Sequence, residues 1–138
     1  MYYLELAKQG QMPTAPVADL LGFRATDFRV GEVTLEYEAQ TEHTNPAGMV
    51  QGGIITTVAD AAMASAYLTT LNQGEFYTTI EVKVNFLRPV RQGMLRFVGK
   101  TLRSGGKIGL AQCEVFDEAG NLVAFATSTC MKIGRAHV

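Results

Sequence analysis

The segment from Gly52 to Leu71 constrains the fold of this 138-residue chain more than any other. It reads GGIITTVADAAMASAYLTTL, an apolar stretch rich in small residues that is typical of one long buried helix. Such a helix needs an apolar surface around it, and its alanines allow a sheet to approach closely. One segment with strand character precedes it and four follow it. The sequence therefore predicts a single α+β domain, residues 1–138, in which a curved antiparallel sheet wraps one central helix.

Alternating apolar and polar residues mark the strand segments. Val33, Leu35 and Tyr37 alternate with polar residues, and the same period of two recurs from Ile80 to Phe86. The separators SGG and EAGN predict hairpin turns between the last three strands. We expect strands at 31–39, 78–90, 93–103, 107–118 and 121–133, and short helices at 2–9 and from residue 16.

Composition narrows the classes of function. A formal net charge of −1 provides no strong field to bind nucleic acid or a membrane surface. Cys113 and Cys130 occur singly and the first residues lack a basic leader, so we expect no metal site and a cytoplasmic location. The helical region contains too many polar residues for a membrane span. Residues 133–138 resemble a translated sequencing adapter and are treated as a non-native tail.

Asp60 is the only carboxylate within the predicted helix. Burial among alanines should raise its pKa, which would suit a general base or a nucleophile. The structural alternative is a buried carboxylate satisfied by a threonine or a backbone N–H. The sequence lacks the motifs of Ser-His-Asp hydrolases, zinc proteases, EF-hands and P-loops, so Asp60 is the strongest candidate for chemistry.

The start of the predicted helix is a second candidate. The first amides of the helix, at about Gln51, Gly52 and Gly53, have no intrahelical partners. No Ser, Thr or Asp stands at Gln51 to cap them, and the two glycines leave them open to the oxygen of a polarised carbonyl. Asp60 follows eight residues after Gly52, roughly 12 Å along the helix, so one reacting carbon cannot contact both groups. If both act, they come from two antiparallel helices across a twofold axis, which requires a dimer.

A longer pattern connects these residues. The motif N-P-x-G-x-x-[H/Q]-G-G-x(6)-D, from Asn45 to Asp60, is followed by T-x-E-V-x-V-N-F-L-R-P. Over about residues 16–132 the chain resembles the hotdog-fold acyl-CoA thioesterases of the phenylacetate-pathway (PaaI-like) type. The resemblance implies a hotdog fold, side-by-side homodimers that pair into a tetramer, and active sites at the subunit interface. It also implies hydrolysis of an acyl-CoA thioester, with CoA as part of the substrate and no cofactor.

The resemblance assigns roles by position. Asp60 resembles the catalytic carboxylate, and Gly52 resembles the backbone donor that polarises the thioester carbonyl. Asn45 resembles the residue that positions the water or the carbonyl group. Thr79, or its neighbour Thr78, resembles a hydroxyl residue that orients the water.

Gln51 departs from the family pattern, which usually has histidine at that position. Glutamine can donate a hydrogen bond but cannot take up a proton. We expect thioesterase activity to persist, and a weak or inactive acyl-CoA-binding sensor is the alternative. A hotdog hydratase would need a histidine beside the carboxylate, and a purely structural dimer would leave Asp60 unexplained.

The remaining candidates would bind the substrate. CoA phosphates need basic partners, and an acyl group needs apolar ones. The candidates are Arg88, Arg91, Arg103 and Lys107 for the phosphates, Gly53 and Thr78 beside the reacting group, and Met63 with Met49, Tyr67 and Phe76 for the acyl group.

Overall fold

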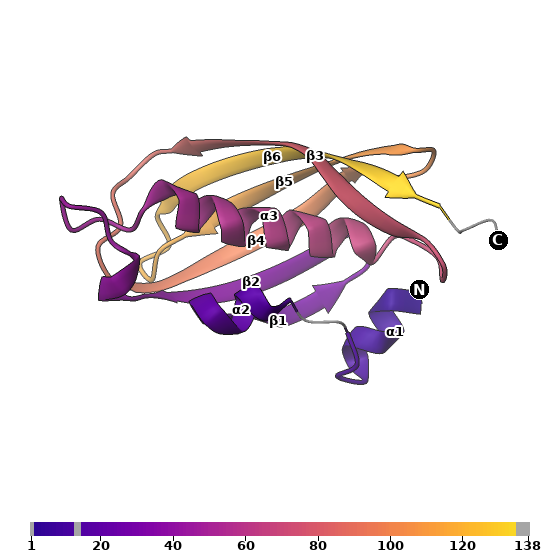
Figure 1. The fold of residues 1–138 in the computed structure, drawn as a ribbon, viewed down its shortest axis with the longest axis horizontal. Coiled ribbons are helices and arrows are strands. Elements are labelled where there is room, and N and C mark those ends of the chain that lie inside the picture. The colour runs from indigo at the N-terminus through magenta and orange to yellow at the C-terminus, as the bar shows by residue number, and fades with distance from the viewer. Residues whose placement is uncertain (1, 13–14, 135–138) are drawn as a thin grey trace.

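One long helix lies in the concave face of a single antiparallel sheet (Figure 1). The structure is a computed structural model that describes residues 2–12 and 15–134. Its elements are α1 (Tyr2–Lys8), α2 (Pro16–Leu21), β1 (Phe23–Arg29), β2 (Glu32–Ala39), η1 (Thr41–His43), α3 (Gly52–Leu68), β3 (Phe76–Phe86), β4 (Gly93–Arg103), β5 (Ile108–Phe116) and β6 (Leu122–Ile133). The predicted α+β hotdog architecture is confirmed.

The strand order places β1 and β3 at the two edges of the sheet. The order is β1-β2-β4-β5-β6-β3, and every neighbouring pair is antiparallel. β4, β5 and β6 form consecutive hairpins, which confirms the turns predicted from SGG and EAGN. β3 does not pair with β4, the next strand along the chain, but with the last strand, β6. The outer edge of β3 therefore has no neighbour among the described residues.

The sheet has six strands, and the sequence predicted five. The missing strand, β1, reads FRATDFR and has no clean alternation of apolar and polar residues. The reason is a bulge between Ala25 and Asp27, which shifts the register against β2 and disturbs the period of two. The helix α3 also ends at Leu68, three residues before its predicted end.

Small residues bring α3 and the sheet into close contact, as the alanine-rich sequence predicted. A side chain at Gly99 on β4 would overlap the backbone carbonyl of Ala62, and one at Gly109 on β5 would overlap the ring of Tyr67. Glycine at these two positions lets the helix backbone and a large ring lie directly on the strands. The core on this face also contains fully buried Val58.

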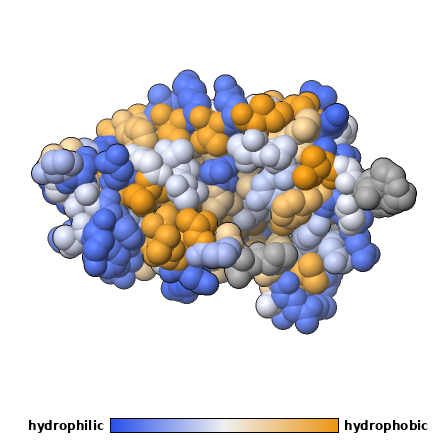
Figure 2. All heavy atoms as spheres, viewed as in Figure 1, coloured by the Kyte–Doolittle hydropathy of each residue, from blue (hydrophilic) through white to orange (hydrophobic). Residues whose placement is uncertain are grey.

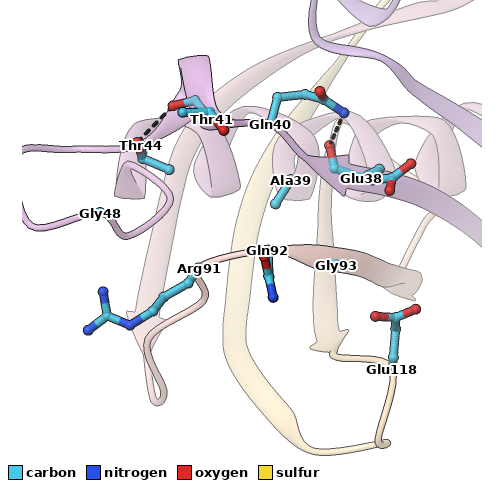
Figure 3. A pocket seen from close by; sticks show the side chains of 10 residues that line it. All are labelled: Glu38, Ala39, Gln40, Thr41, Thr44, Gly48, Arg91, Gln92, Gly93 and Glu118. Atoms are coloured by element: carbon cyan, nitrogen blue, oxygen red, sulfur yellow. Dashed lines mark hydrogen bonds between the residues drawn. The ribbon is translucent and has the colours of Figure 1, made fainter.

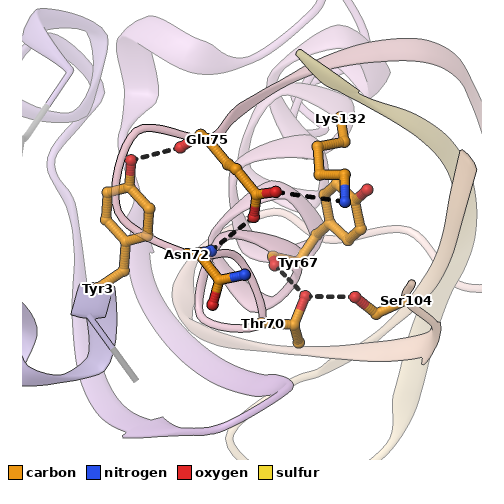
Figure 4. Close-up of polar contacts among 7 residues, drawn as sticks. All are labelled: Tyr3, Tyr67, Thr70, Asn72, Glu75, Ser104 and Lys132. Carbon is orange, nitrogen blue, oxygen red and sulfur yellow. Dashed lines mark hydrogen bonds and ion pairs between the residues drawn. The ribbon is translucent and has the colours of Figure 1, made fainter. Parts of the chain in front are cut away.

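Polar contacts fix the end of the molecule beyond α3 (Figure 4). Glu75 accepts a hydrogen bond from the Asn72 amide at 2.8 Å and forms an ion pair with Lys132 at 3.3 Å. The Tyr3 hydroxyl donates to the Glu75 carbonyl and so ties α1 to the start of β3. β6 continues to Ile133, and residues 135–138 of the suspected tail lie outside the described residues.

Two searches of the described residues bear on membrane and metal binding. No helix within residues 2–12 and 15–134 is long and apolar enough to cross a membrane. Over the same ranges, no three His, Cys, Asp or Glu side chains gather as a metal site would need. Cys113 and Cys130 are both buried and free.

Candidate active site

Asp60 lies on the flank of α3 that faces β3. The Thr79 hydroxyl donates a hydrogen bond to Asp60 Oδ1 at 3.0 Å. Burial raises the pKa of Asp60, and the hydrogen bond from Thr79 lowers it in part. Asp60 has no salt bridge within the described part of the chain. A half-buried carboxylate with one neutral partner is able to accept a proton.

The inner face of β3 completes the surroundings of Asp60. Tyr77 and Thr79 point to the same side of the strand, because side chains alternate along it. Burial and then the charge of Asp60 raise the pKa of the Tyr77 phenol. Thr79 lies opposite buried Cys130 on β6. Thr78, the other hydroxyl candidate, is exposed and lies between two inward-facing residues, so Thr79 is the threonine that reaches the carboxylate.

The start of α3 is open at two amides rather than three. Gln51 precedes the helix and makes no side-chain cap, as predicted. The prediction that its own amide is open is wrong, because this N–H donates to the His43 carbonyl at 2.9 Å. The amides of Gly52 and Gly53 have no hydrogen-bond partner among the described residues. A Cβ at Gly52 would lie 3.0 Å from the Phe86 ring, so any side chain there would crowd that ring.

Asn45 holds the turn in front of the helix. Its Oδ1 accepts hydrogen bonds from the amides of Ala47 at 3.0 Å and Met49 at 3.1 Å. The carbonyl of Ala47 in turn accepts a hydrogen bond from Arg91 Nη1 at 3.0 Å. Because the side-chain oxygen of Asn45 is engaged, its NH₂ group is the part that can act on a ligand.

Within one chain, the two halves of the predicted site do not come together. α3 is continuous from Gly52 to Leu68, so Asp60 and the open amide of Gly52 remain roughly 12 Å apart along it. The structure brings Asp60 together with Thr79, and it places Asn45 in the turn before the helix start. The two halves lie on one helix and do not meet within one subunit.

The four candidate cations form two groups at opposite ends of the molecule. Arg88 and Arg91 follow β3, whose last residue contacts the helix start. Arg103 and Lys107 flank the turn at Ser104, whose hydroxyl is hydrogen-bonded to Thr70 just beyond α3. None of the four has a salt bridge within residues 2–12 and 15–134.

Arg91 also lines a polar cavity of about 690 Å³ near the turn before α3 (Figure 3). Its side chain extends toward the turn that contains Gly48, while Glu38 and Glu118 lie on the other side of the cavity. Two carboxylates would repel phosphate, so this cavity does not suit the CoA phosphates.

The apolar candidates separate into core and cavity residues. Met63 and Tyr67 are almost fully buried in the hydrophobic core, so the structure does not support their assignment to an acyl pocket. An apolar helix residue can face either the core or a pocket, and the sequence alone does not distinguish the two. Phe76 does line a second cavity, beside α3. Ala61 and Ser65 line the same cavity and were missed, although they follow Asp60 at helical spacing.

Similar proteins identify the family of the chain. Residues 47–124 match the model of the Thioesterase superfamily. The 1,4-dihydroxy-2-naphthoyl-CoA hydrolase of Escherichia coli is 31% identical over 109 residues, covering 75% of this chain and 79% of that protein. The chain belongs to the thioesterase superfamily.

Solved structures show the same fold. A phenylacetic acid degradation-related protein from Ralstonia eutropha JMP134 superimposes with a TM-score of 0.85 and 32% identity, covering 94% of this chain and 98% of that chain. The PaaI protein of the Escherichia coli phenylacetic acid degradation operon has a TM-score of 0.87 at 18% identity, covering 97% and 96%. The fold is the one that the motif indicated, and the family is confirmed at the level of the thioesterase superfamily.

Proposed function

We propose that the protein is an acyl-CoA thioesterase that acts as a homodimer with its active sites at the subunit interface. The observation that carries this proposal is the hydrogen bond between Thr79 and Asp60, on the flank of α3 that faces the edge strand β3. It presents a carboxylate of raised pKa in a family of thioester hydrolases. The relatives include an enzyme named for the hydrolysis of an aromatic acyl-CoA.

The edge strand β3 supports the dimer. β3 has 11 residues, and Ile80 and Phe86 on it are 55% and 53% exposed. Hydrophobic side chains gather along the upper rim of the molecule, over β3 (Figure 2). A long edge strand with exposed apolar side chains is a template for another strand. Antiparallel pairing of two β3 strands would set the two α3 helices antiparallel, as the distance between Gly52 and Asp60 requires.

The proposed mechanism uses the Gly52 amide of one subunit and the Asp60 carboxylate of the other. The thioester carbonyl oxygen accepts a hydrogen bond from the Gly52 amide at the positive end of α3, and one such donor stabilises the transition state by about 3 kcal/mol. Asp60 of the partner subunit takes a proton from water as the water oxygen attacks the carbonyl carbon. The C–S bond then breaks, the CoA sulfur receives a proton and the free acid leaves. Direct attack by the carboxylate is the other route to the same products.

Asn45 and Gln51 act as hydrogen-bond donors in this scheme. The free NH₂ group of Asn45 can donate to the carbonyl or to the water. Gln51 is exposed beside the open amides and can donate in the same way, but it cannot exchange a proton. Of these three residues, only Asp60 can transfer a proton.

The dimer also brings the two groups of cations together. α3 has 17 residues and spans roughly 25 Å, so a single chain cannot offer both groups to one CoA molecule. In an antiparallel pair, the end that carries Arg103 and Lys107 approaches the end of the partner subunit that carries Arg88. Basic side chains from both subunits would then bind the CoA phosphates.

The decisive test is Asp60→Asn, assayed by thiol release with a panel of acyl-CoAs. General-base catalysis contributes roughly 10²- to 10⁴-fold, so we expect kcat to fall at least about 100-fold. The melting temperature should stay equal or rise. Because folding raises the pKa of Asp60, its ionised form at neutral pH favours the unfolded chain, and asparagine removes that cost.

Asp27→Asn is the matched control, since Asp27 is an exposed carboxylate on β1. It should keep the activity of the original protein. An Asp60→Asn variant with unchanged kcat would refute the proposal. Saturable binding of acyl-CoA without thiol release would instead identify the protein as the sensor that Gln51 makes conceivable.

A further inference from the structure

The side chain of His43 connects the loop before α3 to the hydrophobic core. Its ring stacks on the ring of Tyr37, with centroids 5.5 Å apart and an angle of 23° between the planes. The Tyr37 hydroxyl oxygen lies 2.5 Å from His43 Nδ1. Tyr37 belongs to β2 and is fully buried, and its ring packs edge-on against Phe97. The loop is therefore attached through one side chain to the packed interior of the sheet.

The Tyr37 hydroxyl is the donor in this contact. Burial raises the pKa of the Tyr37 phenol, so the phenol keeps its proton at neutral pH. A hydrogen bond from the Gln40 backbone N–H to the phenol lowers this pKa in part. Because the phenol oxygen already accepts that bond, its own proton is directed to His43 Nδ1, and the ring hydrogen of His43 lies on Nε2. His43 thus acts as an acceptor.

Residues 43–51 close into a small hairpin in front of α3, and one antiparallel bridge joins its two arms. At its base, the Gln51 amide donates to the His43 carbonyl at 2.9 Å. Asn45 lies two residues after His43, and the open amide of Gly52 directly follows Gln51. Both candidate donors of the site therefore extend from the base that His43 forms.

We propose that His43 is a positioning residue of the candidate site, and that its hydrogen bond with Tyr37 holds the Gly52 amide and the Asn45 side chain in place. This inference rests on the proposed thioesterase function, since these donors act only on a bound thioester. His43 itself does not touch the substrate. A donor to the developing oxyanion acts chiefly in the transition state, so a displaced loop should lower kcat and leave KM nearly unchanged.

Tyr37→Phe removes the donor and keeps the ring. A displacement of about 1 Å can reduce a rate roughly 100-fold, and the ring stacking and the bond to Gln51 remain, so we expect kcat to fall roughly tenfold. KM should change less than threefold, measured with the acyl-CoA that the original protein hydrolyses fastest. Amide hydrogen exchange followed by NMR should be at least tenfold faster at Gln51 and unchanged in β5, because the loop is released while the core stays intact.

Tyr3→Phe is the matched control. It removes the bond of another tyrosine hydroxyl, to the Glu75 carbonyl, and α1 lies at the other end of the molecule from the loop (Figure 1). It should change neither kcat nor the exchange at Gln51. An equal fall of kcat in this control would assign the effect to general destabilisation and overturn the inference.

Variants of His43 test the same bond from the other side. His43→Asn keeps an acceptor, because the Asn Oδ1 stands as far along the side chain as the His Nδ1, whereas His43→Leu has none. The Asn variant should stay within threefold of the original kcat, and the Leu variant should match Tyr37→Phe. In Tyr37→Phe/His43→Leu the losses should not add, since both changes remove one bond. Melting temperatures check folding, and either position is sufficient if the variant of the other does not fold.

The outcomes separate this inference from the proposed function. Unchanged exchange at Gln51 in Tyr37→Phe would overturn it, as would faster exchange with an unchanged kcat. Equal losses in His43→Asn and His43→Leu, or additive losses in the double variant, would overturn it too. If no acyl-CoA releases thiol, the proposed function fails, and exchange at Gln51 then decides alone whether His43 holds the loop. Equal exchange in Tyr37→Phe and the original protein would refute that role.

Discussion

The two edges of the sheet differ in length, charge and cover. β1 has seven residues, exposes Arg24, Asp27 and Arg29, and is flanked by α1 and α2 (Figure 1). β3 has 11 residues and exposes the apolar Ile80 and Phe86 together with only two charged residues, Glu81 and Lys83. Short, charged and covered edges resist pairing with another strand, whereas long apolar edges favour it. The contrast supports the proposal that β3, and not β1, is the edge that pairs with a second subunit.

Both edge strands nevertheless contain a β-bulge. β1 has a bulge at Thr26 and β3 has one at Ile80, since each of these residues is skipped in the register with the neighbouring strand. A bulge bends a strand and re-aims the side chains beside it. On β3 the bulge comes directly after Thr79, which contacts Asp60. The edge proposed for dimerisation is thus also the strand that supplies part of the site.

The largest effect is expected from placing a charge in the bulge of β3. Ile80→Lys would put an ammonium group in the proposed interface, where burial without a partner is unfavourable. We expect a monomer by light scattering and at least a 100-fold loss of thiol release, because each proposed site needs two subunits. Thr26→Lys makes the same change in the bulge of β1 and should leave both properties intact. A fully active dimeric Ile80→Lys variant would exclude β3 as the interface.

A smaller effect is expected on the inner face of β3. Thr79→Val removes the hydrogen bond that lowers the pKa of Asp60, so this pKa should rise further. Because the base must be ionised, the acidic limb of the pH profile of kcat should move to higher pH. Hydrogen bonds to charged groups contribute about 1.5–3 kcal/mol. The lower end of this range applies to a half-buried pair, so we expect roughly a tenfold loss at the lowest pH and a smaller one at high pH.

Thr78→Val is the comparison for this experiment. Thr78 is next in the chain but exposed, so its loss should leave the acidic limb in place. The motif did not decide whether Thr79 or Thr78 acts beside the carboxylate, and the comparison of these two variants does. Equal shifts in both variants, or no shift in Thr79→Val, would show that the contact seen on β3 does not tune the carboxylate.

Local patterns in the sequence predicted much of the fold. The central helix, the hairpins and the residue range of β4 follow from periodicity and turn residues, which depend only on neighbours in the chain. The position of β3 at the edge was not predictable in this way, because its partner β6 is distant in sequence. β1 was missed for a local reason, since its bulge interrupts the alternation.

In the candidate site, too, features that depend on local sequence were predicted, and features that depend on distant contacts were not. Asp60 and the open start of α3 were predicted from helix chemistry, and the helix geometry kept them apart as expected. The bond from the Gln51 amide to His43 was not predicted, because it depends on how the preceding loop folds back. The choice of Thr79 depends on the bulge, and the burial of Met63 depends on which face of α3 meets the sheet. These features require the tertiary structure.

The smallest effect is expected when β1 is made to resemble β3. In the double variant Arg24→Val/Arg29→Val, an apolar edge replaces a charged one. Arg24 is 3.5 Å from Glu36 and Arg29 is 3.3 Å from Asp27, and both pairs are exposed. Each exposed pair contributes about 0–1 kcal/mol, so the loss of both should change the free energy of unfolding by no more than about 2 kcal/mol in urea titrations.

Association should reveal the role of those charges instead. We expect the light scattering of the double variant to increase with protein concentration, as edges of β1 pair between molecules. Arg24→Gln/Arg29→Gln loses the same charge but stays polar, and should associate less than the valine variant. Unchanged scattering in both variants would mean that the shortness of β1 and its cover by α1 and α2 protect this edge without help from its charges, and the contrast between the two edges would then be one of geometry alone.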